Sequence, residues 1–167
     1  MNIDELGWAS GARRVASPNC DERPIQAGID LLVIHNISLP PGEYGGPGVE
    51  QLFTNRLDPD AHPYFAGIHT LRVSSHFFIR RDGELIQFVA CTQRAWHAGA
   101  SSWRERERCN DFSIGVELEG SDDEPFSDAQ YACLNRLIPA LRKAYPSLYE
   151  ATGHSDIAPG RKTDPGP

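Results

Sequence analysis

Long apolar runs are missing from this sequence of 167 residues. No stretch approaches the roughly 20 apolar residues that a helix needs to cross a bilayer. The opening residues, MNIDELGWASGARRV, are acidic early and lack the apolar core of a signal peptide. We therefore expect a cytoplasmic protein with no membrane partner.

Paired cysteine motifs are absent as well. The four cysteines, Cys20, Cys91, Cys109 and Cys133, are scattered along the chain and form no CxxC pair. Without a secretory signal, free thiols are favoured over disulfides.

Positive charge is scarce, because 16 Lys and Arg residues stand against 23 Asp and Glu residues, and the net charge is -7. A nucleic-acid-binding protein would show a basic footprint, so we expect no nucleic-acid partner. The length and the hydrophobic content of 40% are typical of one globular domain. We expect a single domain over residues 1–167 and a monomer.

Hydrophobic patterning predicts three stretches of sheet. Residues 31–35, LLVIH, form a continuous apolar run that ends in His35, as in a buried strand. Residues 75–89 carry apolar runs on both sides of Asp82-Gly83, which is a strong hairpin signal. Residues 113–119, SIGVELE, alternate. One face would carry Ile114, Val116 and Leu118, and the other Gly115, Glu117 and Glu119.

A long helix is expected after residue 127. Ser127 and Gln130 have the spacing of a capping box at its start. We expect Pro139 to kink the helix and Pro146 to end it. The side chains at helical spacing that should face the sheet are Tyr131, Leu134, Leu137, Ile138, Leu141 and Tyr145.

Strands mixed with helices predict an α/β fold with a central sheet covered by helices. A shorter helix is expected near residues 48–55. Residues 38–48 are dense in Pro and Gly, and residues 55–70 also have the composition of a loop. Long irregular segments in small domains often belong to binding sites, so we expect these two to form a cleft wall or a lid.

Three residues have side chains that suit a metal site. His35 ends its strand, where ligands of open sheets gather, and His154 and Asp164 lie in TGHSD and KTDPG. Taken singly, each fits a structural role as a core histidine, a cap or a turn residue. Together, two imidazoles and one carboxylate suit zinc and leave a fourth position for water. Zinc would lower the pKa of that water and polarise a carbonyl oxygen, as the cleavage of an amide requires.

Two further residues could act beside such a metal. Lys162 lies two residues from Asp164 and could stabilise an oxyanion, although a solvated surface lysine is the ordinary alternative. Glu117 lies on the polar face of its strand, where a carboxylate is costly without a partner, and it is a candidate general base. Glu119 shares that face and could instead form a glycosidase pair with Glu117. Gly120, however, would place Glu119 near the strand end and solvent.

Six segments carry a family resemblance. They are VIHNISLPPGEYGG, VSSHFFIRRDGELIQFV, AWHAGASSW, CNDFSIGVELEG, FSDAQYACL and TGHSDIAPGRKTDPGP. They resemble the cytoplasmic AmpD-type 1,6-anhydro-N-acetylmuramyl-L-alanine amidases. That group belongs to a zinc amidase superfamily shared with amidase-type phage lysozymes and peptidoglycan recognition proteins. The resemblance runs from Gly7 to the chain end and implies a mixed β-sheet flanked by helices.

The resemblance also implies a site and a reaction. Zinc would be bound by His35, His154 and Asp164, with Glu117 and Lys162 as the catalytic pair. The implied reaction is hydrolysis of the lactyl amide between muramic acid and L-alanine in anhydromuropeptides that are taken up for peptidoglycan recycling. In bacteria with inducible β-lactamase, such an enzyme degrades the inducer. The alternative is a non-catalytic module that binds peptidoglycan fragments, but such modules typically lose a metal ligand, and all three candidates are present here.

The sequence departs from its relatives at three places. In SSHFF, Ser75 stands where phage-type relatives carry a catalytic tyrosine, which favours Glu117 as the acid/base group; His76 is expected to be structural. Those relatives often use Cys as the third ligand, where this chain has Asp164, with which zinc remains compatible. Relatives usually continue past DPG, whereas this sequence stops at Pro167.

Four residues are candidates for substrate contacts. Asn36 follows a ligand and could bond the peptide, and Trp96 could stack on the sugar or cover the stem peptide. Arg72 and Arg108 could pair with carboxylates of a diaminopimelate-type peptide, because guanidinium binds carboxylate in a bidentate way. A core anchor for Trp96 and surface charge for the arginines are the alternatives. His97 is expected to be mainly structural.

Overall fold

A computed structural model describes residues 1–166 of the chain. A six-stranded sheet forms its centre, in the order β1-β5-β4-β9-β3-β10. These strands are β1 (Arg13–Arg14), β3 (Leu31–Ile37), β4 (Phe77–Ile79), β5 (Leu85–Gln87), β9 (Ser113–Glu119) and β10 (Glu150–Gly153). Strands β4 and β5 pair antiparallel and the other neighbours pair parallel. The mixed sheet implied by the resemblance is therefore confirmed.

Smaller elements surround this sheet. The helices are α1 (Gly48–Phe53), α2 (Pro63–Ala66), α3 (Asp128–Ala144), α4 (His154–Ile157) and the 3-10 helix η1 (Cys109–Asp111). Two short antiparallel pairs join β2 (Cys20–Glu22) to β6 (Gln93–Ala95) and β7 (Ser102–Trp103) to β8 (Arg106–Glu107). Within residues 1–166, no helix is long and apolar enough to cross a membrane. All four cysteines are free.

The predicted strands form, and the observed bounds of β3 and β9 agree closely with those expected from the sequence. Strand β9 has the bounds expected from its alternation, and β3 is two residues longer than the apolar run. The hairpin turns at Gly83, whose φ of +86° suits glycine. Strand β10 was not expected, because EATG is short and mostly polar; it forms by pairing with β3 in parallel.

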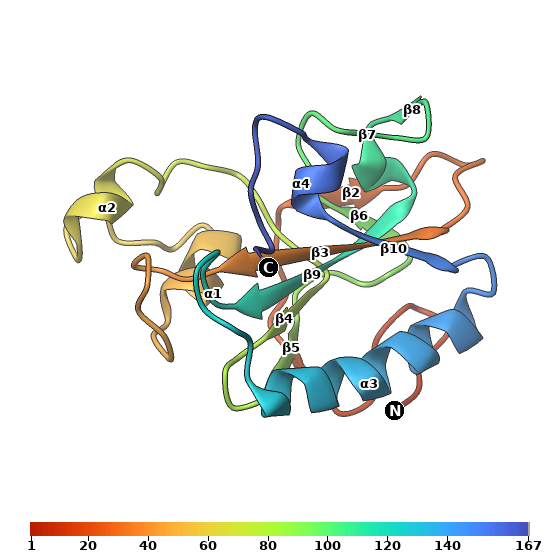
Figure 1. The fold of residues 1–167 in the computed structure, drawn as a ribbon, viewed down its shortest axis with the longest axis horizontal. Helices are drawn as coiled ribbons and strands as arrows, with labels where there is room; N and C mark the ends of the chain where they lie inside the picture. The colour runs from red at the N-terminus through yellow and green to blue at the C-terminus, as the bar shows by residue number, and fades with distance from the viewer. Residues whose placement is uncertain (167) are drawn as a thin grey trace.

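The two faces of the sheet pack against different elements. On one face, Leu32, Ile114 and Val116 form a core with Leu137 and Leu141 of α3, and Figure 1 shows α3 running along that side. The alternation of β9 directs its odd-numbered side chains to the opposite face. On that face, buried side chains of α1 pack near β4 and β5, and residues 97–112 pack near β3. The candidate site also lies there.

Helix α3 confirms the predicted cap and corrects one predicted contact. Ser127 Oγ accepts a hydrogen bond from the backbone N–H of Gln130, and Gln130 Oε1 accepts one from Ser127 N–H. The helix continues through Pro139 and ends at Ala144. The expectation that Tyr131 faces the sheet is wrong, since it is 48% exposed. Gln130 is buried instead, because its amide donates to the carbonyls of Ile79 and Glu119.

The two irregular segments lie beyond the end of β3. Residues 38–47 are irregular as expected and lead into α1, which confirms the short helix predicted there. The segment 55–70 also contains α2, whose first turn is capped by His62 through a hydrogen bond from Tyr64 N–H. Figure 1 shows α2 projecting outward from the sheet.

Candidate metal centre and active site

The parallel pairing of the central strands brings site residues to one edge of the sheet. His35 on β3 is the register partner of Glu117 on β9, so both side chains leave the same face on adjacent strands. Strand β10 runs parallel to β3, with Gly153 opposite Ile34, and His154 follows directly. The carboxyl ends of three parallel strands therefore converge here, as in other open sheets that bind ligands.

The C-terminal segment completes this cluster. After α4 the chain turns at Gly160 (φ +75°) and returns, and Figure 1 shows it running back to the end of β3. Ser155 N–H donates to the carbonyl of Asp164 at 2.8 Å. Asn36 Nδ2 donates to the carbonyl of Pro165 at 2.9 Å and to Asp122 Oδ1 at 2.6 Å. The bonds to Asp164 and Pro165 attach the returning segment to α4 and to β3, and the bond to Asp122 attaches the loop after β9 to β3.

The three candidate ligands converge on one point. His35 Nδ1 and His154 Nδ1 lie 2.9 Å apart, and Asp164 Oδ2 lies 3.2 Å and 3.1 Å from them. Donor atoms around a tetrahedral zinc ion, at bond lengths of about 2.0–2.1 Å, would be about 3.3 Å from one another. The three atoms thus have nearly the separations that a zinc site needs, and the donor set of two imidazoles and one carboxylate suits zinc.

The surroundings favour the ligand forms of these groups. Burial lowers the pKa of His35 to about 4, although the nearby Asp164 carboxylate acts to raise it. Burial acts to raise the pKa of Asp164, but its close polar contacts with His154 and His35 outweigh this and hold that pKa well below its usual range. A neutral imidazole and an ionised carboxylate are the forms that bind a metal.

Glu117 lies beside the three ligands without a partner of its own. The residue is 7% exposed, and Oε2 is buried with no hydrogen-bond partner among the described residues. Burial raises the pKa of Glu117 well above its usual range; the negative charge of Asp164 raises it further, and Lys162 opposes both. Lys162 is exposed at the rim. A carboxyl with a raised pKa holds a proton more readily than an ordinary glutamate, as a general acid/base group must.

A cavity of about 500 Å³ opens over this cluster. Besides the candidate ligands, Glu117 and Lys162, both irregular segments contribute to its wall, through Leu39, Pro41, Tyr64 and Ile68, and Leu71 follows directly after the second segment. The expectation that these segments form a cleft wall is therefore supported. The wall residues Tyr64 and Leu71 are about half exposed, at 46% and 47%. Their apolar character within a loop was the one signal in the sequence for their position.

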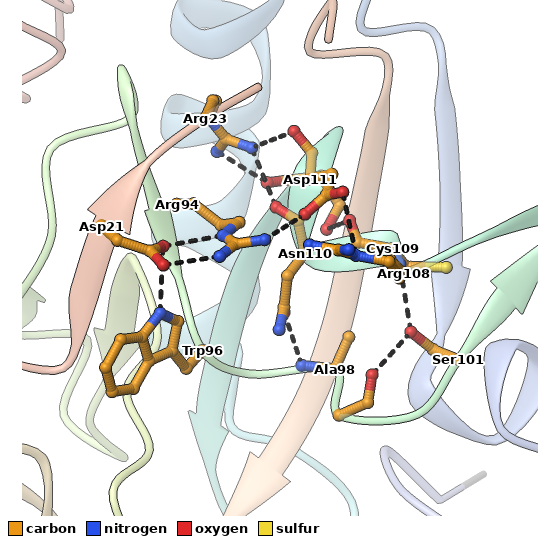
Figure 2. A network of polar contacts seen from close by, with 12 residues as sticks. Asp21, Arg23, Arg94, Trp96, Ala98, Ser101, Arg108, Cys109, Asn110 and Asp111 are labelled. Carbon is orange, nitrogen blue, oxygen red and sulfur yellow. Dashed lines mark hydrogen bonds and ion pairs between the residues drawn. The ribbon is translucent and has the colours of Figure 1, made fainter. Parts of the chain in front are cut away.

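Trp96 lines the cavity and is held by a polar network (Figure 2). Its indole N–H donates to Asp21 Oδ1 at 3.1 Å, and Asp21 accepts two hydrogen bonds from Arg94. Arg94 also pairs with Asp111 of η1. Trp96 is thus an oriented wall residue and not a fully buried core anchor.

The other candidate contacts lie at different places. Asn36 lines the cavity, but its amide donates to Asp122 and to the Pro165 carbonyl. Arg72 is exposed, does not line the cavity, and donates to backbone carbonyls at 69–71. Arg108 is exposed, pairs with Asp111, and lines a second hollow with Arg161. The structure therefore brings Asn36 and Trp96 to the cavity but not the two arginines.

Glu119 corrects an expectation from the sequence. It is 3% exposed and not near solvent. Its Oε1 accepts from Gly45 N–H at 2.6 Å and its Oε2 accepts from Arg81 N–H at 3.0 Å. Because both carboxylate oxygens attach loops to the sheet, Glu119 has a structural role, which counts against a glycosidase pair. Ser75 is buried and does not line the cavity either.

Comparisons with known proteins agree with this arrangement. Residues 25–167 match the family described as N-acetylmuramoyl-L-alanine amidase. The 1,6-anhydro-N-acetylmuramyl-L-alanine amidase AmpD of Citrobacter freundii is 60% identical over 100% of this chain and 89% of its own length. A crystal structure of a selenomethionine AmpD derivative superimposes with a TM-score of 0.97 at 59% identity, covering 100% of this chain and 93% of that one.

A more distant solved structure is of the Escherichia coli amidase AmiD in complex with anhydro-N-acetylmuramic acid-L-Ala-D-γ-Glu-L-Lys. It is 28% identical with a TM-score of 0.58, and the match covers 98% of this chain and 60% of that one.

Proposed function

This chain belongs to the N-acetylmuramoyl-L-alanine amidase family, and from that premise we propose that it is a zinc enzyme acting on anhydromuropeptides. The bond cleaved is the lactyl amide between 1,6-anhydro-N-acetylmuramic acid and L-alanine. The observation that carries the proposal is the convergence of His35 Nδ1, His154 Nδ1 and Asp164 Oδ2 beside the unpartnered carboxyl of Glu117. The names of the relatives, and the muropeptide bound by AmiD, support the substrate class.

His35, His154 and Asp164 would hold the zinc ion. Zinc bound there would supply acidification of a water molecule and polarisation of the scissile carbonyl. The chain's own contribution to binding is a buried, nearly pre-formed set of three donor atoms, two from the sheet edge and one from the returning C-terminal segment.

Glu117 would move the proton of the reaction. Its position beside the ligands lets it accept a proton from the attacking water and then donate it to the amide nitrogen, so that the amine leaves neutral. The raised pKa of Glu117 supports this double role, because the carboxyl then accepts a proton more readily than an ordinary glutamate. Lys162, at the cavity rim, would stabilise the negative charge that develops on the carbonyl oxygen.

The wall of the cavity would hold the rest of the substrate. Trp96, oriented by Asp21, supports stacking against the sugar or the stem peptide, and Asn36 supports a contact near the scissile bond. Arg72 and Arg108 would act at a greater distance, by attracting the peptide carboxylates to an otherwise acidic protein. We propose a cytoplasmic role in peptidoglycan recycling, which the four free thiols support. Where the host has inducible β-lactamase, this role would lower the inducer.

The test combines metal content with hydrolysis of a defined anhydromuropeptide and of intact peptidoglycan. Asp164→Ala should lose zinc and activity together, whereas Asp60→Ala, at an exposed aspartate of the loop 55–70, should keep both. A fully active Asp164→Ala protein without metal would contradict the metal site. Binding of the muropeptide without hydrolysis by the zinc-loaded protein would favour the non-catalytic binding module instead.

A further inference from the structure

A buried series of hydrogen-bonded polar groups runs from His35 through His97, which also lines the cavity, to Ser113 and Cys109 beneath it. His35 Nε2 lies 2.9 Å from His97 Nδ1, and His97 Nε2 lies 3.2 Å from Ser113 Oγ. The Ser113 hydroxyl donates to the backbone carbonyl of Cys109 at 2.5 Å. His35, His97, Ser113 and Cys109 are all buried, with at most 9% exposure. Of these four residues, the proposed reaction uses only His35, as a zinc ligand; His97, Ser113 and Cys109 have no part in it.

The direction of every hydrogen bond in this buried series follows from its last group, the backbone carbonyl of Cys109. A serine hydroxyl has one proton, and in Ser113 that proton is used by the Cys109 carbonyl, which can only accept. Ser113 Oγ must therefore accept from His97, which places a proton on His97 Nε2. In the neutral ring His97 Nδ1 is then an acceptor, so His35 Nε2 carries the proton that it receives. The lone pair of His35 is left on Nδ1, the atom that faces His154 and Asp164.

The backbone carbonyl of Ala98, the residue after His97, fixes the proton position of His154 in the same way. His154 Nε2 lies 3.1 Å from the carbonyl oxygen of Ala98, which can only accept, so His154 also has its proton on Nε2 and its lone pair on Nδ1. Asn110 Oδ1 accepts from the backbone N–H groups of both His97 and Ala98, at 3.1 Å and 2.8 Å. Figure 2 shows the bond from Ala98 to Asn110.

Strand β9 provides the space for this arrangement. A Cβ atom on Gly115 would lie 2.5 Å from His97 Cγ and 2.7 Å from His97 Nδ1, so only glycine leaves room for the ring. Ser113, Gly115 and Glu117 alternate along one face of the strand. That face thus anchors the His97 ring, leaves space for it and presents the candidate acid/base carboxyl.

We propose that His97 is a positioning residue. Ser113 fixes the proton of His97 on Nε2, and His97 in turn holds His35 in the tautomer that presents Nδ1 as a lone-pair donor to zinc. A polar group that orients a metal-binding histidine typically changes metal affinity about 10- to 100-fold when it is removed. The inference rests on the proposed zinc site for its consequence, but the tautomer itself is a property of the metal-free protein.

The first experiment measures that tautomer directly. Long-range ¹H–¹⁵N NMR of the metal-free wild-type protein should show His35 with its proton on Nε2. In His97→Phe, which keeps the volume of the ring but not its nitrogen atoms, and in Ser113→Ala, His35 should populate the other tautomer. A proton on His35 Nδ1 in the wild-type protein would overturn the proposal, even if zinc binding and hydrolysis were normal.

The second experiment measures zinc affinity by competition with a chelator. His97→Phe should weaken binding about 10- to 100-fold, and His97→Asn, which restores an acceptor near His35, should recover part of the loss. The control is His76→Phe, at a fully buried histidine that bonds Gly115, Gln93 and Arg23 and packs edge-on against the His97 ring, but bonds neither His35 nor His154. Equal losses in His97→Phe and His76→Phe would reduce His97 to a structural residue and overturn the proposal. Absence of zinc binding by the wild-type protein would contradict the proposed function and leave the NMR result to decide the tautomer.

Discussion

At the scale of single residues, Glu117 has the most unusual environment in the site. It is a buried carboxyl whose Oε2 has no partner among residues 1–166, and a negative charge lies close by at Asp164. A carboxyl in such a place costs folding free energy, which supports the proposed role of Glu117 in proton transfer. Glu119, two residues along the same face, has both oxygens bonded and shows the contrasting structural case.

Replacing Glu117 by Gln should therefore separate chemistry from metal binding. Glu117→Gln keeps the shape but cannot accept a proton, so turnover should fall by about 10²- to 10⁴-fold while the zinc content stays at the wild-type level. Both are measured on one preparation, by kcat on an anhydromuropeptide and by elemental analysis. Turnover within threefold of wild type would remove Glu117 from the mechanism.

Gly115 is a residue whose absent side chain matters. Gly115→Ala would place Cβ 2.5 Å from the His97 ring, and such overpacking should lower the free energy of unfolding by about 1–3 kcal/mol. Gly28→Ala is the matched control, since nothing lies within 4 Å of its Cβ position. Urea unfolding of the two variants checks the prediction, and equal stability of the two would contradict it.

At the scale of elements, α1 is attached to the sheet by a charged cluster. Glu50 on α1 pairs with Arg13 of β1 and with Arg80, which follows β4. The hydrogen bond from Arg13 lowers the pKa of Glu50 to about 2; burial opposes this shift and Arg80 adds to it. Because α1 carries Leu52 and Phe53 of the cavity wall, this cluster connects the fold to the binding site.

The stabilisation from Glu50 should depend on pH in a defined direction. The pKa is lower in the folded state than its ordinary value of 4.5, so the stabilisation is complete above pH 4.5 and is lost as the pH falls toward about 2. Glu50→Gln should lower the free energy of unfolding by about 1 kcal/mol at pH 7, and the difference from wild type should shrink between pH 4.5 and 2.

Urea titrations at several pH values measure this difference. Glu43→Gln is the control, because Glu43 is exposed and belongs to no ion pair among the described residues. A difference between wild type and Glu50→Gln that stays constant down to pH 2 would show that the ion pairs contribute nothing.

At the scale of the whole molecule, one site joins segments that are distant in sequence. His35 and Asp164 are 129 positions apart, and binding of one ion to both would close most of the chain into a loop. Zinc that binds only the folded state would stabilise it by about 2.7 kcal/mol at a free concentration a hundredfold above Kd.

Removal of the metal should therefore lower Tm by roughly 5–10 °C and increase hydrogen exchange most in residues 158–166. Calorimetry in zinc and in chelator measures the shift. Asp164→Ala, which lacks a ligand, should show no dependence on chelator. Equal Tm values of the wild-type protein in zinc and in chelator would contradict the proposed link between the metal and the returning segment.

The sequence by itself determined the local features of this protein. The capping box at Ser127, the turn at Gly83 and the alternation of β9 each depend on neighbours within a few residues, so they can be predicted without a fold. The types of donor atom and the family motifs also identified His35, His154 and Asp164 as candidate ligands. The helical spacing of apolar residues did not determine every buried position of α3. Tyr131 and Gln130 are adjacent, and only packing decided that Gln130 is the buried one.

Only the tertiary structure decided how these parts meet. The register of parallel strands depends on contacts between residues far apart in the chain. The local sequence pattern therefore predicted neither that His35 lies beside Glu117 nor that EATG forms β10. The direction of the hydrogen bonds from Ser113 through His97 to His35 depends on three segments packed together. His97 looked like a structural histidine in the sequence because its partner atoms come from other strands and loops, and folding alone brings them within hydrogen-bond distance.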